Sequence, residues 1–301
     1  MKKLITLCLF LSCIFPGPDS AIAQADIAID VIYVSGGGGG ENNTIWQIDS
    51  SGMSFSFTPH ESTWGLALDG SGNLLATNYG AKKLEKFDYN GNADIVASTE
   101  GFPQALTLDA AGNIYVANWD TGTVEKFNSS GTGSVFASGL TNPRGLAFNN
   151  GYLYVADYTA GTIVKFNSSG TGSVFASGLA KPVALAFDSE GYLYVANHVQ
   201  DLTPYVGTIE KFDSSGNSSL FAQGLSGPSG LAFDSSGNLY VTNYLIGTIE
   251  KFDSSGTQST FATGISYPVG IAAQVPEPAT VALLGLGSLT VIRRRLARRK
   301  F

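Results

Sequence analysis

Short polar side chains that could bind a cation recur along this chain about 40 residues apart. Each is an asparagine or aspartate that follows a mainly apolar run: Asn78, Asn118, Asp157, Asn197 and Asn243. A ring of such oxygen-bearing groups around an opening could coordinate a hard cation. The competing interpretation is that each residue ends a strand by bonding to its own turn. Recurrence in every complete copy favours this second interpretation, because functional sites usually break a repeat.

These residues belong to a segment of about 40 residues that is repeated with few changes. The last copy is GLAFDSSGNLYVTNYLIGTIEKFDSSGTQSTFATGISYPV, residues 230–269, and the others begin at Gly65, Ala105, Gly145 and Ala184. In the last copy we expect strands at Leu231–Asp234, Leu239–Asn243, Thr248–Phe252 and Ser259–Thr263. The DSSG segments between them are typical turn sequences. A β-rich repeat of this length indicates a propeller or a related array.

Each end of the repeat region supplies part of one more copy. Val31–Ser35 is aligned with the LYVAN run, Thr44–Gly52 with TIEKFDSSG, and Ser54–Thr58 with the fourth run, while Gly270–Gln274 supplies a lone first strand. Pairing strands from both ends would remove exposed sheet edges. We therefore predict an all-β fold, a six-bladed β-propeller with terminal-strand (Velcro) closure over residues 26–274. Its blades span 30–64 with 270–274, 65–104, 105–144, 145–183, 184–229 and 230–269.

The N-terminal segment 1–25 has the three parts of a secretory signal peptide. Lys2 and Lys3 precede an apolar run from Leu4 to Phe15, and Ala-x-Ala sites end at Ala23 and Ala25. The two cysteines of the chain lie within this segment. The exported chain is thus expected to contain no disulfide, so that packing must supply its stability.

The C-terminal segment 275–301 departs from the repeat. Val275, Pro276, Glu277 and Pro278 precede an apolar stretch, Ala279–Ile292, that we expect to form a short helix. Arg293, Arg294 and Arg295 begin a basic end. A stretch of this length is short for a stable transmembrane helix, although the arginines would hold its end on the cytoplasmic side. One interpretation is therefore a short membrane anchor.

Two family resemblances arise from these motifs. The repeat core Pro-x-Gly-Leu-Ala-Phe-Asp-x-x-Gly-Asn-Leu-Tyr-Val-Ala-Asn resembles NHL-type repeats, which form six-bladed propellers with varied functions. The tail resembles a PEP-CTERM sorting signal. That resemblance implies transient anchoring in the inner membrane, recognition by an exosortase, and cleavage near the Pro-Glu-Pro motif. The protein would then be exported to the cell surface or to the exopolysaccharide matrix.

The charge distribution argues against a nucleic-acid partner. Residues 26–275 carry a net charge of about −13 and no cluster of basic residues. Binding to phosphates requires such a cluster, because it displaces counterions.

Two long connections break the symmetry of the repeat, at Gly36–Asn43 and at His198–Val206, which includes Tyr205. Both would lie on the face where second strands end, so they are candidate contact loops, although drift of surface loops would give the same pattern. Four aromatic residues on this face could stack on sugar rings or pack between blades: Tyr79, Trp119, Tyr158 and Tyr244.

These patterns favour a non-catalytic binding protein without a cofactor, whose ligand is a surface polysaccharide or a protein. The ligand-face candidates are Asn78, Asn118, Asp157, Asn197, Asn243, His198 and Tyr205. The alternative is a metal-dependent lactonase of the gluconolactonase type or a propeller lyase. Glu61 and Trp64 resemble part of the lactonase entry motif, and that resemblance implies a divalent cation bound by Glu61, Asn118, Asp157 and Asn197.

Overall fold

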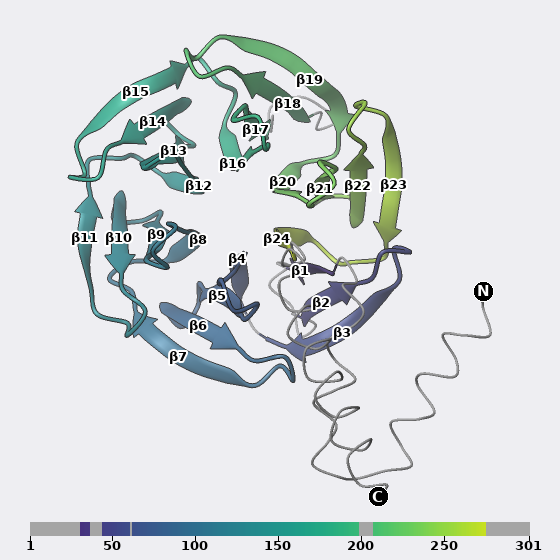
Figure 1. Cartoon of the computed structure of the whole chain (residues 1–301), viewed down its shortest axis with the longest axis horizontal. Helices are drawn as coiled ribbons and strands as arrows, with labels where there is room; N and C mark the ends of the chain where they lie inside the picture. The colour runs from purple at the N-terminus through teal and green to yellow at the C-terminus, as the bar shows by residue number, and fades with distance from the viewer. Residues whose placement is uncertain (1–30, 37–43, 61, 199–206, 275–301) are drawn as a thin grey trace, which may run out of the picture. The chain divides into compact units, whose positions relative to one another are not determined.

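The protein forms six four-stranded antiparallel sheets arranged around a central axis (Figure 1). The computed structural model describes residues 31–36, 44–60, 62–198 and 207–274. This confirms the predicted all-β propeller closed by strands from both ends. The expected helix at 279–292 lies outside the described residues. Within the described ranges, no helix is long and apolar enough to cross a membrane.

The strands are assigned to blades 1 to 6 in chain order. Blade 1 contains β24 (Pro268–Ala273), β1 (Ile32–Gly36), β2 (Thr44–Ile48) and β3 (Ser54–Pro59). Blade 2 contains β4 (Thr63–Leu68), β5 (Leu74–Asn78), β6 (Lys83–Phe87) and β7 (Ala93–Ser98). Blade 3 contains β8 (Pro103–Leu108), β9 (Ile114–Asn118), β10 (Thr123–Phe127) and β11 (Gly133–Ala137). Blade 4 contains β12 (Pro143–Asn149), β13 (Tyr152–Asp157), β14 (Thr162–Phe166) and β15 (Gly172–Ser177). Blade 5 contains β16 (Pro182–Phe187), β17 (Leu193–Asn197), β18 (Gly207–Phe212) and β19 (Ser218–Leu225). Blade 6 contains β20 (Pro228–Phe233), β21 (Leu239–Asn243), β22 (Thr248–Phe252) and β23 (Gln258–Thr263).

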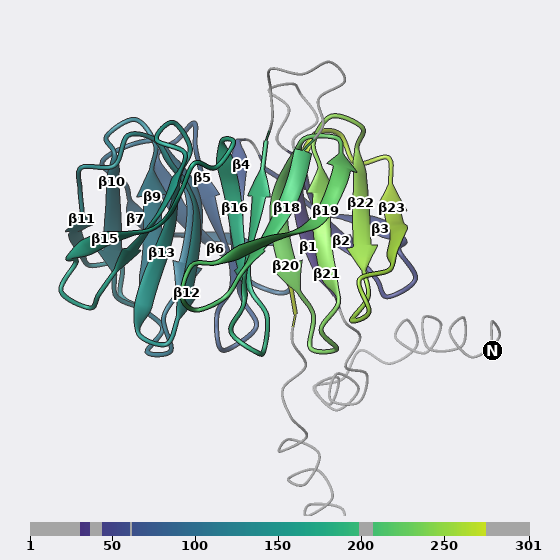
Figure 2. The same cartoon turned by 90° about the horizontal axis from the view of Figure 1, so that it is seen from above.

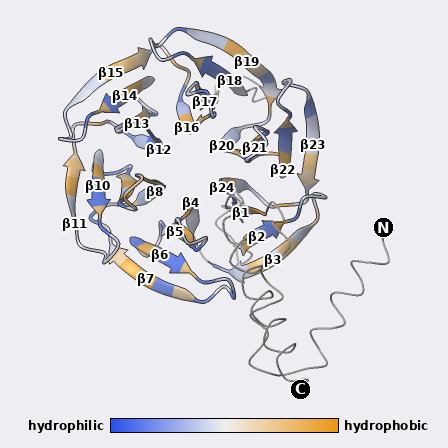
Figure 3. Ribbon diagram, viewed as in Figure 1, coloured by the Kyte–Doolittle hydropathy of each residue, from blue (hydrophilic) through white to orange (hydrophobic). Residues whose placement is uncertain are grey.

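Neighbouring blades are held together by packing between their apolar faces. The second strands are buried on both faces, as in β9, where all five residues are buried. The repeated tyrosine of the LYVAN run packs into the interface. Tyr115 lies 5.0 Å from Phe136 and 5.5 Å from Phe148 between ring centroids. The fourth strands form the exposed rim, and hydrophilic residues mark the third strands (Figures 2 and 3).

A buried carboxylate ties the loop that enters a blade to that blade. In blade 3, Glu125 Oε2 accepts hydrogen bonds from Asn118 Nδ2 at 2.6 Å and from the Glu100 backbone N–H at 3.2 Å. In blade 2, His60 Nε2 lies 2.7 Å from Glu85 Oε2.

Blade 4 moves this carboxylate to the neighbouring strand. Val164 stands at the glutamate position, and Asp157 stands where the other complete blades have asparagine. Asp157 accepts the backbone N–H groups of Thr141 and Asn142 at 2.7 and 2.9 Å. Blade 4 thus keeps a carboxylate in contact with its entry loop but supplies it from the second strand.

The split blade differs from the alignment expected from the sequence. The register pairs Ile32 with Ile48 and Val34 with Trp46, so Ile32–Gly36 corresponds to LYVAN. The alignment of Val31–Ser35 was therefore wrong by one residue, and Gly36, not Ser35, occupies the Asn position. The Ser35 side chain instead contacts the first strands, because Gly270 N–H donates to its Oγ at 2.9 Å.

The closure of the ring can be tested by truncation. Ending the chain at Tyr267 would remove β24 and expose the edge of β1, which β24 covers through pairs such as Val34 with Ile271. We expect this chain to lose cooperative thermal unfolding. A control chain ending at Gln274 should unfold cooperatively, and equal behaviour of the two chains would contradict the closure.

Glu125 gives a second test, through pH. Burial raises the pKa of Glu125, and repulsion by Glu100 adds to this, while the hydrogen bonds from Asn118 and Glu100 N–H oppose it. The folded state therefore keeps a proton that the unfolded state has lost, and stability falls as pH rises from about 4.3 through the raised pKa.

Glu125→Gln retains an oxygen acceptor and removes this titration. Urea unfolding at pH 7 should show the variant equal to the parent or about 1 kcal/mol more stable, with no advantage below about pH 4. The exposed Glu190→Gln is the control. A loss of more than about 2 kcal/mol at pH 7 would show that the negative charge itself holds the loop.

Candidate functional site

The six first strands surround a cavity of about 240 Å³ on the propeller axis. The second residue of each strand lines it: Trp64, Gln104, Arg144, Val183, Ser229 and Val269. A ring of aliphatic residues follows two positions further along: Leu66, Leu106, Leu146, Leu185, Leu231 and Ile271. We call this cavity the axial funnel. Its volume lies below the range of about 300–1,000 Å³ typical of ligand pockets, which suits one ring-sized group.

Small residues between the two rings allow the first strands to approach closely. A Cβ at Gly65 would lie 2.8 Å from Gln104 O, and a Cβ at Gly145 would lie 2.8 Å from Val183 O. The same position is Gly or Ala in every blade, because backbone of the next blade occupies this space. The backbone around the axis is thus uniform, and the side chains just before this position give the funnel its chemistry.

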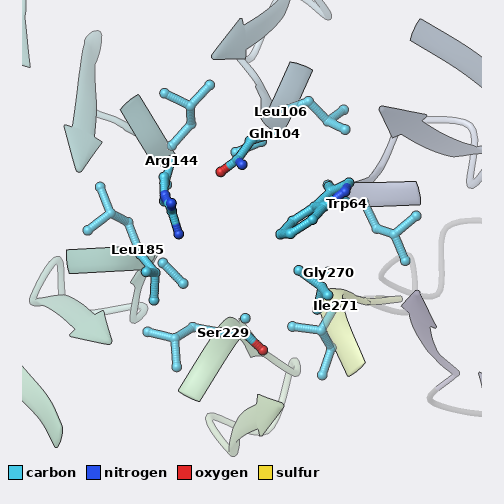
Figure 4. Close-up of a pocket in the computed structure, with 18 of the residues that line it drawn as sticks. Trp64, Gln104, Leu106, Arg144, Leu185, Ser229, Gly270 and Ile271 are labelled. Carbon is cyan, nitrogen blue, oxygen red and sulfur yellow. The ribbon is translucent and has the colours of Figure 1, made fainter. Parts of the chain in front are cut away.

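The first ring has a different chemistry in almost every blade. It combines an indole, an amide, a guanidinium and a hydroxyl with two valines. Figure 4 shows Trp64 and Arg144 facing one another across the opening, with Gln104 on one side and Ser229 opposite. The second ring is aliphatic throughout. The funnel therefore has polar and aromatic groups over an apolar lining.

Arg144 is the only arginine between residues 26 and 275. Its guanidinium carbon lies 3.7 Å from the ring centroid of Tyr158, and its Nε donates to Asn142 Oδ1 at 3.0 Å. Among the described residues, no carboxylate forms an ion pair with it. Burial lowers its pKa, while Tyr158 and Tyr79 oppose this effect, and an arginine keeps its charge nonetheless. A fixed positive charge with unused donors is thus presented to the funnel.

Trp64 continues into a set of stacked aromatic rings on blades 2 and 3. Its ring lies 5.7 Å from that of Tyr79, which stacks on Phe102 at 4.9 Å and on Trp119 at 6.4 Å. Trp119 Nε1 also donates to the Tyr79 hydroxyl at 3.0 Å. Two of the predicted aromatic residues, Tyr79 and Trp119, therefore pack on one another across blades. Through the contact of Tyr79 with Trp64, this packing holds the indole of Trp64 in its position at the funnel.

His198 and Tyr244 also line the funnel, from the second strands' end. Burial lowers the pKa of His198, and the positive charges of Arg144 and Lys181 lower it further. The imidazole is therefore mostly neutral at pH 7. Of the predicted ligand-face residues, His198 is the one that the described cavity lining includes. Tyr205 lies outside the described residues.

The Asn and Asp side chains at the strand ends lie between blades. Asn118, Asp157, Asn197 and Asn243 are at most 3% exposed. Asn197 Nδ2 donates to Glu210 Oε1 at 2.8 Å, as Asn118 does to Glu125. Asn78 does the same to Glu85, and its Oδ1 accepts the Ala81 N–H of its own turn. The Asn amide nitrogens thus bond within their own blades, whereas Oδ1 of Asn118, Asn197 and Asn243 is buried without a hydrogen-bond partner among the described residues.

The residues implied for a metal site are spread over several blades. Asn118, Asp157 and Asn197 come from blades 3, 4 and 5, and Glu61 lies outside the described residues. In the described parts of the chain, no three His, Cys, Asp or Glu side chains are close enough to hold a metal ion.

Reasoning from the repeat missed the first ring of the funnel. The motif Pro-x-Gly-Leu contains a usable signal. The residues on either side of x are nearly constant between copies, while x itself is different in most of them. The presence of the domain's lone arginine at one of these positions is a second signal.

Comparisons with known proteins identify the C-terminal tail and the fold of the repeat region. Residues 274–299 match the family described as the PEP-CTERM protein-sorting motif. A comparison with curated protein sequences finds no match.

Solved structures share the propeller fold. A nidogen/laminin complex matches with 18% identity and a TM-score of 0.72, covering 83% of this chain and 100% of that one. A streptogramin B lyase matches with 17% identity and a TM-score of 0.62, covering 83% and 88%. The Staphylococcus aureus virginiamycin B lyase matches with 16% identity and a TM-score of 0.59, covering 80% and 87%. At these identities the likeness shows the fold alone. The chain is thus a six-bladed β-propeller protein with a PEP-CTERM sorting signal, exported across the inner membrane to the cell surface or beyond.

Proposed function

We propose that this protein is a non-catalytic binding protein of the cell surface or exopolysaccharide matrix, and that the axial funnel holds its ligand. The observation that carries the proposal is the varied first ring in an otherwise regular propeller. Trp64 offers a flat apolar surface, while Gln104 and Arg144 offer hydrogen-bonding groups. A small number of convergent polar groups in an apolar pocket is typical of ligand sites. Carbohydrate rings suit this combination, and the sorting signal delivers the protein to where such polymers lie.

The lining of the funnel supports binding more than catalysis. General acid–base catalysis usually requires a base and an acid with matched pKa values within reach of the substrate. In the described lining, His198 is the one imidazole, its pKa is lowered by burial and by nearby positive charge, and no carboxylate accompanies it. Turnover of a bound fragment in the titration below would instead support a catalytic function.

Binding in the funnel is tested by substituting Trp64. Purified protein would be titrated with a panel of neutral and acidic polysaccharide fragments by calorimetry. Trp64→Ala should weaken binding roughly tenfold, because the stacking surface is lost. Trp46→Phe is the control, since Trp46 packs beside the core of the closing blade interface.

Two results would contradict this function. Unchanged affinity in Trp64→Ala would place the ligand elsewhere. Consumption of a fragment during the titration, followed by chromatography, would show catalysis.

The sorting step is tested by mass spectrometry of the C-terminus of the extracellular protein. We expect cleavage near Pro276–Pro278 and loss of the arginine-rich end, because the motif at 274–299 marks it for exosortase processing. Glu277→Ala should leave the protein in the membrane fraction. An exported protein that keeps Arg293–Arg295 would contradict this.

A further inference from the structure

We propose that the funnel selects an acidic sugar, a uronic acid unit, by pairing its carboxylate with Arg144 while its ring lies against Trp64. This inference rests on the proposed binding function and specifies the ligand class. It is argued from the charge and geometry of the first ring.

The positive charge of Arg144 is unusual for its surroundings. The domain has a net charge of about −13, and its lysines commonly lie near aspartates, as Lys86 does to Asp69 at 2.7 Å. Arg144 has no such partner among the described residues. Its one hydrogen bond there uses Nε, so the two terminal nitrogens have donors left over.

The orientation of the guanidinium is fixed before any ligand arrives. Tyr158 stacks on it at 3.7 Å, and Asn142 holds Nε at 3.0 Å. A planar fork held in this way matches the two oxygens of a carboxylate. Because the side chain is partly buried, the pairing would be stronger than on an open surface. Preorganisation also reduces the entropy lost on binding.

The neighbouring groups favour an anion at the same place. Lys181 and Arg144 both lie near enough to His198 to lower the pKa of its imidazole. The described funnel lining contains no acidic side chain to repel a carboxylate.

The opposite wall identifies the rest of the ligand. Trp64 faces Arg144 across the opening in Figure 4, and Gln104 and Ser229 lie between them on either side. A sugar ring against the indole would direct hydroxyls toward the Gln104 amide, whereas the Ser229 hydroxyl already donates to Pro268 O at 2.7 Å. A cavity of about 240 Å³ holds one such unit, so a longer chain would extend out of the opening.

The test compares trigalacturonate with galactotriose, its neutral counterpart, on the full-length protein in mild detergent at low salt. Trigalacturonate should bind about 10- to 100-fold more tightly, because a charge-assisted bidentate pair forms only with the acid. Arg144→Gln should reduce this preference to about threefold or less. Arg144→Lys should recover part of it, because it keeps the charge and loses the fork. Lys251→Gln, on a third strand of blade 6, is the control for a change in net charge.

A second readout comes from the histidines, of which the chain has two. In histidine-labelled protein followed by NMR, bound trigalacturonate should raise the pKa of His198, because a carboxylate near Arg144 offsets its repulsion. The His60 resonances serve as the reference. The shift should disappear in Arg144→Gln.

Three results would overturn the inference. Equal affinity for the two trisaccharides, unaffected in Arg144→Gln, would leave the binding function standing and remove the acidic preference. Acetate binding as tightly as trigalacturonate would indicate a site for simple anions. Absence of binding by either trisaccharide, with other fragments still bound in a Trp64-dependent way, would show that the funnel takes a different ligand.

Discussion

The pairing of β24 with β1 is the constraint on which the propeller depends. Each blade buries its faces only against its neighbours, so an open array would leave two apolar faces and two strand edges in water. Here residues 235 positions apart in the chain meet, as in the bond from Gly270 N–H to Ser35 Oγ. Closure then fixes six first strands around one axis, close enough that backbone meets backbone. The dimensions of the funnel follow from that closure.

In each first strand, the position that the fold constrains and the position that varies between blades are adjacent in the chain. The Gly or Ala of each first strand permits close approach, and the leucine or isoleucine after it lines the axis. These positions cannot vary without disturbing the ring. The residue just before them faces the opening and carries no such requirement. Variation at this position can therefore alter the chemistry of the funnel without altering the fold, and Trp64 and Arg144 stand at two such positions.

The sequence was sufficient to predict the blades and the closure, because the strands alternate with unmistakable turns and the incomplete copies are complementary. The predicted alignment of β1 with the LYVAN run was wrong by one residue, since Gly36 has no side chain that would mark it as the Asn position. Three of the strand-end residues, Asn78, Asn118 and Asn197, proved to bond glutamates of the third strand. That partnership joins residues seven or more positions apart through a sheet register, which the repeat alone does not reveal.

The funnel was harder to predict for a different reason. Its lining comes from six segments spread over the chain, and the first-ring residue that each contributes differs in type between most blades. Only the ring geometry brings Trp64 opposite Arg144 (Figure 4). The orientation of the Arg144 guanidinium is also not visible in the sequence. In the proposed site, Arg144 pairs with a carboxylate only if Tyr158 and Asn142 hold its guanidinium toward the opening.

The central claim is that the asymmetric ring of the funnel is the ligand site. A crystal structure of the protein with a bound acidic oligosaccharide tests it most directly. The account predicts one sugar ring against Trp64, with its carboxylate on the guanidinium of Arg144. Well-defined density for the sugar on the outer rim or between blades, with the funnel holding only solvent, would contradict it.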